Sequence, residues 1–179
     1  MKLLHLSDLH LGKKLDEFSL YEDQKYILQR IVQMICAKQP DCVLLAGDIY
    51  DKPVPPAEAV VLFDNFLNQL AELKVPVCII SGNHDSAERL AFGAQLMSGS
   101  GIHFAGSYNG EEQKLVFEDE FGRVNIFLLP FLKPAVVKHW APEEAAAEIT
   151  SYHDAVKYAV SQLPLVQEER NVLVAHQFV

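Results

Sequence analysis

The sequence has few cysteines, no long apolar run and no excess of basic residues. Its three cysteines, Cys36, Cys42 and Cys78, lack C-x-x-C spacing, so we expect small core residues in a reducing cytoplasm rather than a disulfide framework or a zinc finger. No apolar stretch reaches the roughly 18 residues of a membrane span. His5 and Asp8 interrupt the first apolar residues too early for a signal peptide.

The charge balance is acidic, with 15 basic against 24 acidic residues and a net charge of −9. A protein that binds nucleic acid through its bulk charge has the opposite sign. Binding to nucleic acid would therefore require a local patch, metal ions or segments outside this sequence.

The chain of 179 residues is long enough for one domain, and half of its residues are apolar. Short apolar runs alternate with stretches of helical periodicity, which predicts a layered α/β fold with parallel strands at its centre. In the first half we expect strands at 3–6, 41–46 and 75–80 and helices at 21–38, 57–73 and 87–97. In the second half we expect strands at 102–105, 114–117, 124–129 and 171–174 and an alanine- and glutamate-rich helix at 142–162.

Residues that can bind a metal follow the predicted carboxyl ends of four strands, where ligands bind in open α/β sheets. They are Asp8 and His10, Asp48 and Asp51, Asn83 and His84, and His176. This mixture of oxygen and imidazole donors suits Mn²⁺, Fe²⁺ or Zn²⁺ better than Mg²⁺ or Ca²⁺. We expect the residues to converge on one pocket that holds two ions about 4 Å apart, an arrangement that serves phosphoryl transfer by a metal-activated water.

Each motif alone also has a structural explanation. A Gly-Asp pair after a strand is often only a turn or a helix cap, and a single histidine such as His176 is more often a hydrogen-bonded core residue. The segment 82–85 (Gly-Asn-His-Asp) exceeds what a turn requires. Four such motifs at successive strand ends favour a functional site over four unrelated turns.

The other histidines and two lysines are weaker candidates. We expect His5 to be buried within its strand, and three histidines that follow no strand end to be surface or structural residues: His103, His139 and His153. Lys13 and Lys14 either contact phosphate or form a solvated pair.

The order D-x-H, G-D-x-x-D, G-N-H-D and a later histidine resembles the calcineurin-like metallophosphoesterase family over the whole chain. Five segments are similar, within that family, to DNA nucleases of the Mre type: residues 5–12, 46–51, 82–86, 129–131 and 175–178. The resemblance implies an α-β-β-α sandwich and a Mn²⁺-dependent DNA exonuclease or endonuclease of DNA repair or recombination. It also implies an ATPase partner with long coiled coils.

The resemblance further implies a role for each strand-end residue. One metal would be bound by Asp8 and His10, both metals by Asp48, and the second metal by Asn83 and His176. His84 would face the scissile phosphate, and Asp51 is a second catalytic candidate.

The same resemblance implies a homodimer through the helices at 57–73 and 87–97. The apolar residues of these helices, about half of which must face the sheet, are Val61, Leu62, Phe66, Leu90 and Phe92. The family's further G-H-x-H motif, its capping domain and its ATPase-binding segment do not occur in this sequence. We therefore expect residues 1–179 to be the N-terminal part of the phosphoesterase domain, incomplete at its C-terminus and weakly active alone. Two other functions stay open: a phosphoesterase for small phosphodiesters or phosphoproteins, and a non-catalytic scaffold.

Overall fold

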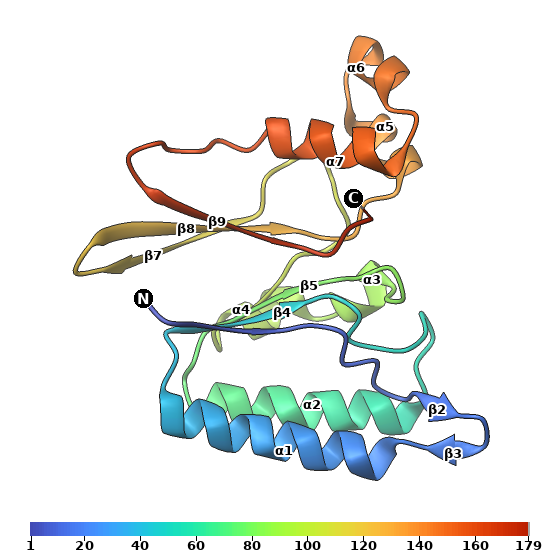
Figure 1. Ribbon diagram of the computed structural model, residues 1–179, viewed down its shortest axis with the longest axis vertical. Helices are drawn as coiled ribbons and strands as arrows, with labels where there is room; N and C mark the ends of the chain where they lie inside the picture. The colour runs from blue at the N-terminus through green and yellow to red at the C-terminus, as the bar shows by residue number, and fades with distance from the viewer. Residues whose placement is uncertain (179) are drawn as a thin grey trace.

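A computed structural model describes residues 1–178 as two facing β-sheets with helices on both outer sides (Figure 1). The first sheet has the order β1-β4-β5-β6, and all of its strands are parallel: β1 (Leu3–Leu6), β4 (Cys42–Ala46), β5 (Val77–Ile80) and β6 (Ile102–Phe104). The second sheet is mixed. Its strands are β7 (Lys114–Asp119), β8 (Gly122–Leu129) and β9 (Arg170–Ala175), with β8 antiparallel to β7 and parallel to β9.

Helices α1 (Tyr21–Lys38) and α2 (Ala57–Glu72) cover the outer face of the first sheet (Figure 1). The outer side of the second sheet carries α5 (Pro134–Trp140), α6 (Glu143–Glu148) and α7 (Tyr152–Ser161). These layers confirm the expected α-β-β-α sandwich. No helix in the described part of the chain combines the length and the apolar character that a membrane span needs.

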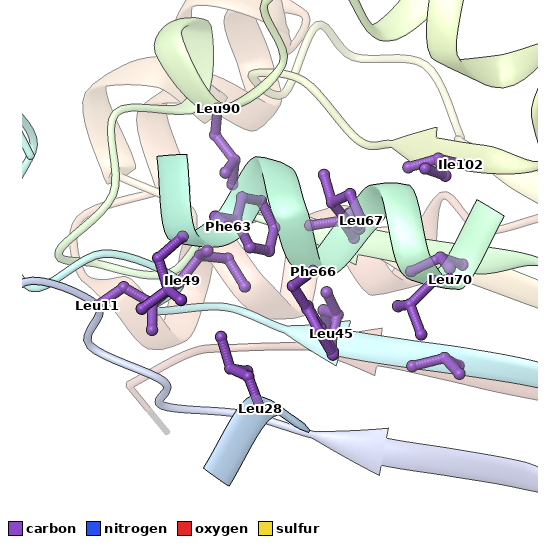
Figure 2. Packing of buried hydrophobic residues seen from close by; sticks show 14 of the residues in the cluster. Leu11, Leu28, Leu45, Ile49, Phe63, Phe66, Leu67, Leu70, Leu90 and Ile102 are labelled. Atoms are coloured by element: carbon purple, nitrogen blue, oxygen red, sulfur yellow. The ribbon is translucent and has the colours of Figure 1, made fainter. Parts of the chain in front are cut away.

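The first sheet is covered on both faces, which explains its continuous apolar strands. Every residue of β4 and β5 is buried. Val43 and Leu45 face the helices, where Phe66 and Leu70 of α2 point toward β4 (Figure 2). The intervening residues of β4 face the second sheet and pack with residues such as Ile126. Successive side chains of β4 therefore belong alternately to the core under the helices and to the core between the two sheets.

Two predicted helices are divided in the structure. The segment 87–97 forms α3 (Ala87–Leu90) and α4 (Ala94–Ser98), separated by Gly93 with a φ of 76°. The segment 142–162 is divided at Ile149, which is buried in an extended conformation, and Ser151 then begins α7 with a capping box. Two further elements were not expected from the sequence: α5, and the hairpin formed by β2 (Lys14–Leu15) and β3 (Phe18–Ser19).

Two burial predictions are wrong. His5 is exposed, because β1 lies at the edge of its sheet and has a neighbouring strand on one side only. Cys36 is exposed, because it follows the buried Ile35 on α1 and its side chain leaves the helix in a different direction. Cys42 and Cys78 are buried free thiols, as expected.

Candidate metal centre

The loops that follow β1 and β4 run side by side and carry three of the predicted ligands. The amide of Asp8 donates to the carbonyl of Gly47 (3.1 Å), and the amide of His10 donates to the carbonyl of Asp48 (2.9 Å). Asp8, His10 and Asp48 all have a positive φ, of 58°, 43° and 50°. Residues other than glycine adopt this conformation at a cost of about 1–3 kcal/mol each, and such strain concentrates at functional sites.

Asp48 lies at the centre of the predicted residues, with only 4% of its side chain exposed. Its Oδ1 accepts a hydrogen bond from the amide of His84 at 2.9 Å. Its Oδ2 lies 3.6 Å from Nε2 of His10 and 3.5 Å from Nε2 of His176. One oxygen is therefore held by the backbone, while the other is directed toward two imidazole nitrogens.

Two groups of potential ligand atoms share this aspartate. One consists of Asp8, Asp48 and His176, and the other of His10, Asp48 and His84, with all ligand atoms of a group within 4.8 Å of one another. Asn83 joins the first group, because its Oδ1 lies 3.3 Å from Nε2 of His176. The structure thus brings six of the seven predicted residues together.

The seventh residue, Asp51, lies beside the Nδ1 atoms of His10 and His84. Its carboxylate is 3.6 Å from Nδ1 of His10 and 4.0 Å from Nζ of Lys13, and its carbonyl is 3.0 Å from Nδ1 of His84. A carboxylate or carbonyl beside the second nitrogen of an imidazole is the usual means of orienting a metal-binding histidine. Lys14 is exposed on β2 and belongs to neither ligand group.

The hydrogen bond made by the His176 ring leaves the lone pair of its other ring nitrogen directed toward the candidate ligands. Nδ1 of His176 lies 2.8 Å from the carbonyl of Ala46, which can only accept, so Nδ1 carries the proton and Nε2 is unprotonated in the neutral ring. That nitrogen faces oxygens of Asn83 and Asp48, which are also electron-rich. Groups of this kind repel one another unless a proton or a cation lies between them.

The residues present fit a divalent cation. Ligand atoms that each lie about 2.1 Å from one ion are roughly 3.0–3.5 Å from one another. The distances of 3.5–3.8 Å from Asp48 and Asp8 to the imidazoles of His10 and His176 approach this spacing. Nε2 of His10 is the nitrogen that faces Asp8 and Asp48, whereas its Nδ1 is buried on the side of Asp51, 3.6 Å from that carboxylate and without a hydrogen-bond partner among the described residues. Mixed oxygen and nitrogen donors match Mn²⁺, Fe²⁺ or Zn²⁺.

Two glycines allow this close packing. A Cβ atom on Gly47, which has a φ of 87°, would lie 2.7 Å from the His176 ring. A Cβ atom on Gly82 would overlap the Asp48 carboxylate. Any side chain at these two positions would therefore displace a candidate ligand.

Sequence reasoning missed Asp85, whose carboxylate joins two of the loops. It accepts hydrogen bonds from the amides of Ile49 (3.1 Å), Tyr50 (2.9 Å) and Gly82 (2.9 Å). Burial raises the pKa of Asp85, against the effect of these hydrogen bonds. Asp85 could have been found as the fourth residue of the Gly-Asn-His-Asp motif. Its carboxylate connects the loop that carries Asp48 to the loop that carries Asn83.

The helices proposed for self-association divide as expected between core and surface. Leu62, Phe66 and Leu90 are buried in the core, whereas Val61 and Phe92 are exposed. The interface itself stays a prediction.

Comparison with known proteins agrees with the fold. The pattern of the calcineurin-like phosphoesterase family matches residues 1–168, which contain every candidate ligand except His176. The chain is 33% identical over 179 residues to the SbcD subunit of the nuclease SbcCD of Staphylococcus epidermidis, in an alignment that covers 98% of this chain and 46% of that protein. The chain thus spans about half the length of the curated relative it matches. With the sandwich fold, the strand-end motifs and this match together, the chain belongs to the calcineurin-like phosphoesterase family.

Proposed function

We propose that this member of a hydrolase family is a metal-dependent DNA nuclease of the SbcD type, which cleaves phosphodiester bonds in DNA repair or recombination. The observation that carries the proposal is the position of Asp48 between two groups of ligand side chains. The relative, which is named as part of a nuclease, supports DNA as the substrate class. Because the chain is acidic overall, contact with DNA would concentrate at the metal centre and in segments outside this sequence.

We assign Asp8 and His10 to one ion, Asp48 to both ions, and Asn83 and His176 to the other. Two divalent cations held by these residues would polarise the phosphoryl oxygens and supply an activated water molecule as the nucleophile. Mn²⁺ is the ion we favour, with Fe²⁺ and Zn²⁺ as alternatives. The 3.8 Å between Oδ1 of Asp8 and Nε2 of His10 supports their pairing. The compact groups of the structure divide the residues differently, with Asp8 beside His176 and His10 beside His84 around the shared Asp48.

His84 has the contacts of a residue that acts on the phosphate. Its ring is exposed, and the carbonyl of Asp51 fixes the proton on Nδ1 at 3.0 Å. When the ring is also protonated on Nε2, that nitrogen can donate to a phosphoryl oxygen or to the leaving group. Asp51 then acts by orienting His84 with its carbonyl and by supporting His10 with its carboxylate.

Metal-dependent hydrolysis tests the proposal directly. The protein expressed from its complete reading frame should hydrolyse linear DNA with Mn²⁺, and Asp48→Asn should abolish hydrolysis. The matched control is Asp64→Asn, because Asp64 is an exposed carboxylate on α2 that belongs to neither ligand group. Turnover of a small diester without turnover of DNA would instead support a phosphoesterase for small substrates. The absence of both Mn²⁺ binding and turnover would support a non-catalytic scaffold.

We further propose an SbcC-like ATPase as the partner, because the relative's name describes one part of a two-component nuclease. The free thiols fit a reducing compartment, and we propose the cytoplasm as the place of action. For the homodimer, the most exposed apolar residues of the two helical segments are Val61 (55% exposed), Phe92 (85%) and Leu96 (86%). Light scattering should report a dimer that Phe92→Asp weakens, and a wild-type monomer would contradict this contact.

A further inference from the structure

A hollow of about 330 Å³ opens beside the candidate metal centre. Its wall includes Asn83, Ser86, Glu88, Ser107, Phe131 and Lys133. Asn83 also contacts His176, so this residue links the hollow with the proposed ligands. The volume is at the lower end of the roughly 300–1,000 Å³ of small-ligand sites.

Phe131 belongs to an aromatic cluster that begins at this wall. Its ring centroid lies 5.2 Å from that of Phe178 and 5.8 Å from that of Tyr152, and those two rings are 5.3 Å apart. Phe178 is 52% exposed and Tyr152 is 39% exposed. The neighbouring Gln177 donates its side-chain amide to the carbonyl of Pro130 at 2.7 Å. This hydrogen bond joins the segment that carries Phe178 to the segment that carries Phe131.

The backbone also fixes the distance of Phe131 from the metal centre. The amide of Phe131 donates to the carbonyl of Ser81 at 2.9 Å, two residues before Asn83. The segment after β8 thus runs directly beside the segment after β5. Asn83 and Phe131 both line the hollow, so a group bound there lies between the metal centre and the aromatic cluster.

The charged groups in the wall favour an uncharged ligand. The carboxylate of Glu88 accepts hydrogen bonds from the hydroxyls of Ser107 (2.8 Å) and Ser86 (3.0 Å). Its own backbone amide and these hydroxyls, with a smaller contribution from Lys133, hold the pKa of Glu88 below its usual range. The carboxylate of Asp85, also in the wall, is occupied by three backbone amides. The wall thus carries two carboxylates, Glu88 and Asp85, against the single ammonium of Lys133, which does not suit a second phosphate.

We infer that this hollow holds the base of the nucleotide next to the scissile phosphate, stacked on Phe131 with Tyr152 and Phe178 behind it. The inference rests on the proposed function, because the phosphate at the metal centre brings the base to this wall. A base is planar and uncharged, and every base has a face that stacks on an aromatic ring. A base held in this way cannot stay stacked in the duplex, so the protein should prefer unpaired or frayed ends.

The inference predicts a defect that depends on the presence of a base. Phe131→Ala should lower kcat/KM for thymidine 5′-(4-nitrophenyl phosphate) about tenfold or more. A loss of this size is what the removal of one base–aromatic stacking contact produces. It should leave kcat/KM for methyl 4-nitrophenyl phosphate within about twofold, because that ester has no base to stack. Phe131→Tyr, which keeps the ring, should restore the rate, whereas Phe131→Leu, which keeps only the volume, should not. The control is Phe121→Ala, an aromatic that is 76% exposed at the turn between β7 and β8.

Equilibrium binding supplies a readout that does not depend on turnover. In the presence of a chelator, the anisotropy of a labelled single-stranded oligonucleotide should show weaker binding to Phe131→Ala than to the wild type. Removal of the terminal base should weaken wild-type binding and leave the binding of Phe131→Ala unchanged.

The outcomes separate this inference from the proposed function. Equal losses on both esters would give Phe131 a structural role and overturn the inference while the nuclease stands. A wild-type protein that cleaves neither oligonucleotides nor the nucleotide ester would overturn the proposed function itself. Preferential turnover of a phosphopeptide would assign the hollow to an amino-acid side chain and overturn the inference.

Discussion

The two sheets contribute to the candidate site in different ways. The first is parallel throughout and buried on both faces, and the ends of β1, β4 and β5 supply every candidate ligand but one. The second is mixed and has an edge strand, β9, in which Leu173 is 41% exposed, yet it supplies His176 and the aromatic Phe131. The buried parallel sheet thus positions most of the candidate ligands. The less buried second sheet contributes one further candidate ligand, His176, and the aromatic wall of the neighbouring hollow, Phe131.

The strongest test of this difference is the removal of Asp48, the ligand shared by both groups. We expect Asp48→Ala to abolish Mn²⁺ binding in titration calorimetry. We expect turnover to fall by more than about 10³-fold, beyond the loss from a single transition-state contact. His176→Ala, at the end of the second sheet, should remove one ligand of one ion and leave measurable binding. Equal retention of Mn²⁺ by both variants would show that Asp48 is not the shared ligand.

The ligands of the first sheet could be predicted from the sequence because they follow regular apolar strands. The D-x-H, G-D-x-x-D and G-N-H-D motifs come directly after β1, β4 and β5, and parallel strands bring their carboxyl ends to one edge. His176 was also predicted from its position after the strand at 171–174, and the family resemblance supported it, because a single histidine carries no local pattern of its own.

Most of the remaining features depend on tertiary contacts that leave no local pattern. The positive φ of Asp8 and His10 follows from the pairing of two loops that are distant in the sequence. The role of Asp85 depends on backbone amides of another loop. The aromatic cluster joins Phe131, Tyr152 and Phe178 from three segments of the second half. The expected helix at 142–162 is interrupted because Ile149 is buried, and the local mark of the break is the capping-box pattern Ser151-x-x-Asp154, which sequence reasoning missed.

A second test separates His84, which we propose to act on the phosphate, from the candidate ligands. We expect His84→Ala to reduce kcat by about 10²–10³-fold, the usual effect of removing a transition-state contact. Mn²⁺ affinity should change little, because the hydrogen bond from residue 84 to Asp48 comes from the backbone amide and survives the substitution. Parallel measurements of kcat and of the Mn²⁺ dissociation constant check this. A loss of affinity as large as the loss of turnover would make His84 a ligand.

A third test compares the packing of the two sheets. Leu70 of α2 is fully buried against the first sheet, whereas Leu173 of β9 is 41% exposed. We expect Leu70→Ala to lower the free energy of unfolding by about 2–5 kcal/mol, because it removes buried methyl groups and leaves a cavity. Leu173→Ala should cost less than about 1 kcal/mol, because half-exposed side chains lose little burial. Denaturant unfolding measures both, and similar values would show that β9 is better covered than its exposure indicates.

The smallest effect is expected at the opposite end of the second sheet, where Asp119 joins β7 to β9 and to the start of the chain. Its carboxylate accepts hydrogen bonds from Arg170 at 2.5 and 3.0 Å and from the Met1 ammonium at 2.5 Å. Arg170, then the ammonium, hold the pKa of Asp119 well below its usual range.

The sign of this shift fixes the pH dependence. A carboxyl group with a lowered pKa stabilises the fold above its unfolded pKa of about 3.9, and that stabilisation is lost as the pH falls toward the folded value. Asp119→Asn should therefore lower the melting temperature at pH 7, and the difference from the wild type should shrink as the pH falls below about 4. Glu118→Gln, on the exposed neighbour in β7, is the matched control and should show a smaller difference at pH 7. A difference for Asp119→Asn that stays constant from pH 7 to acid would mean that the charge of Asp119 contributes nothing to stability.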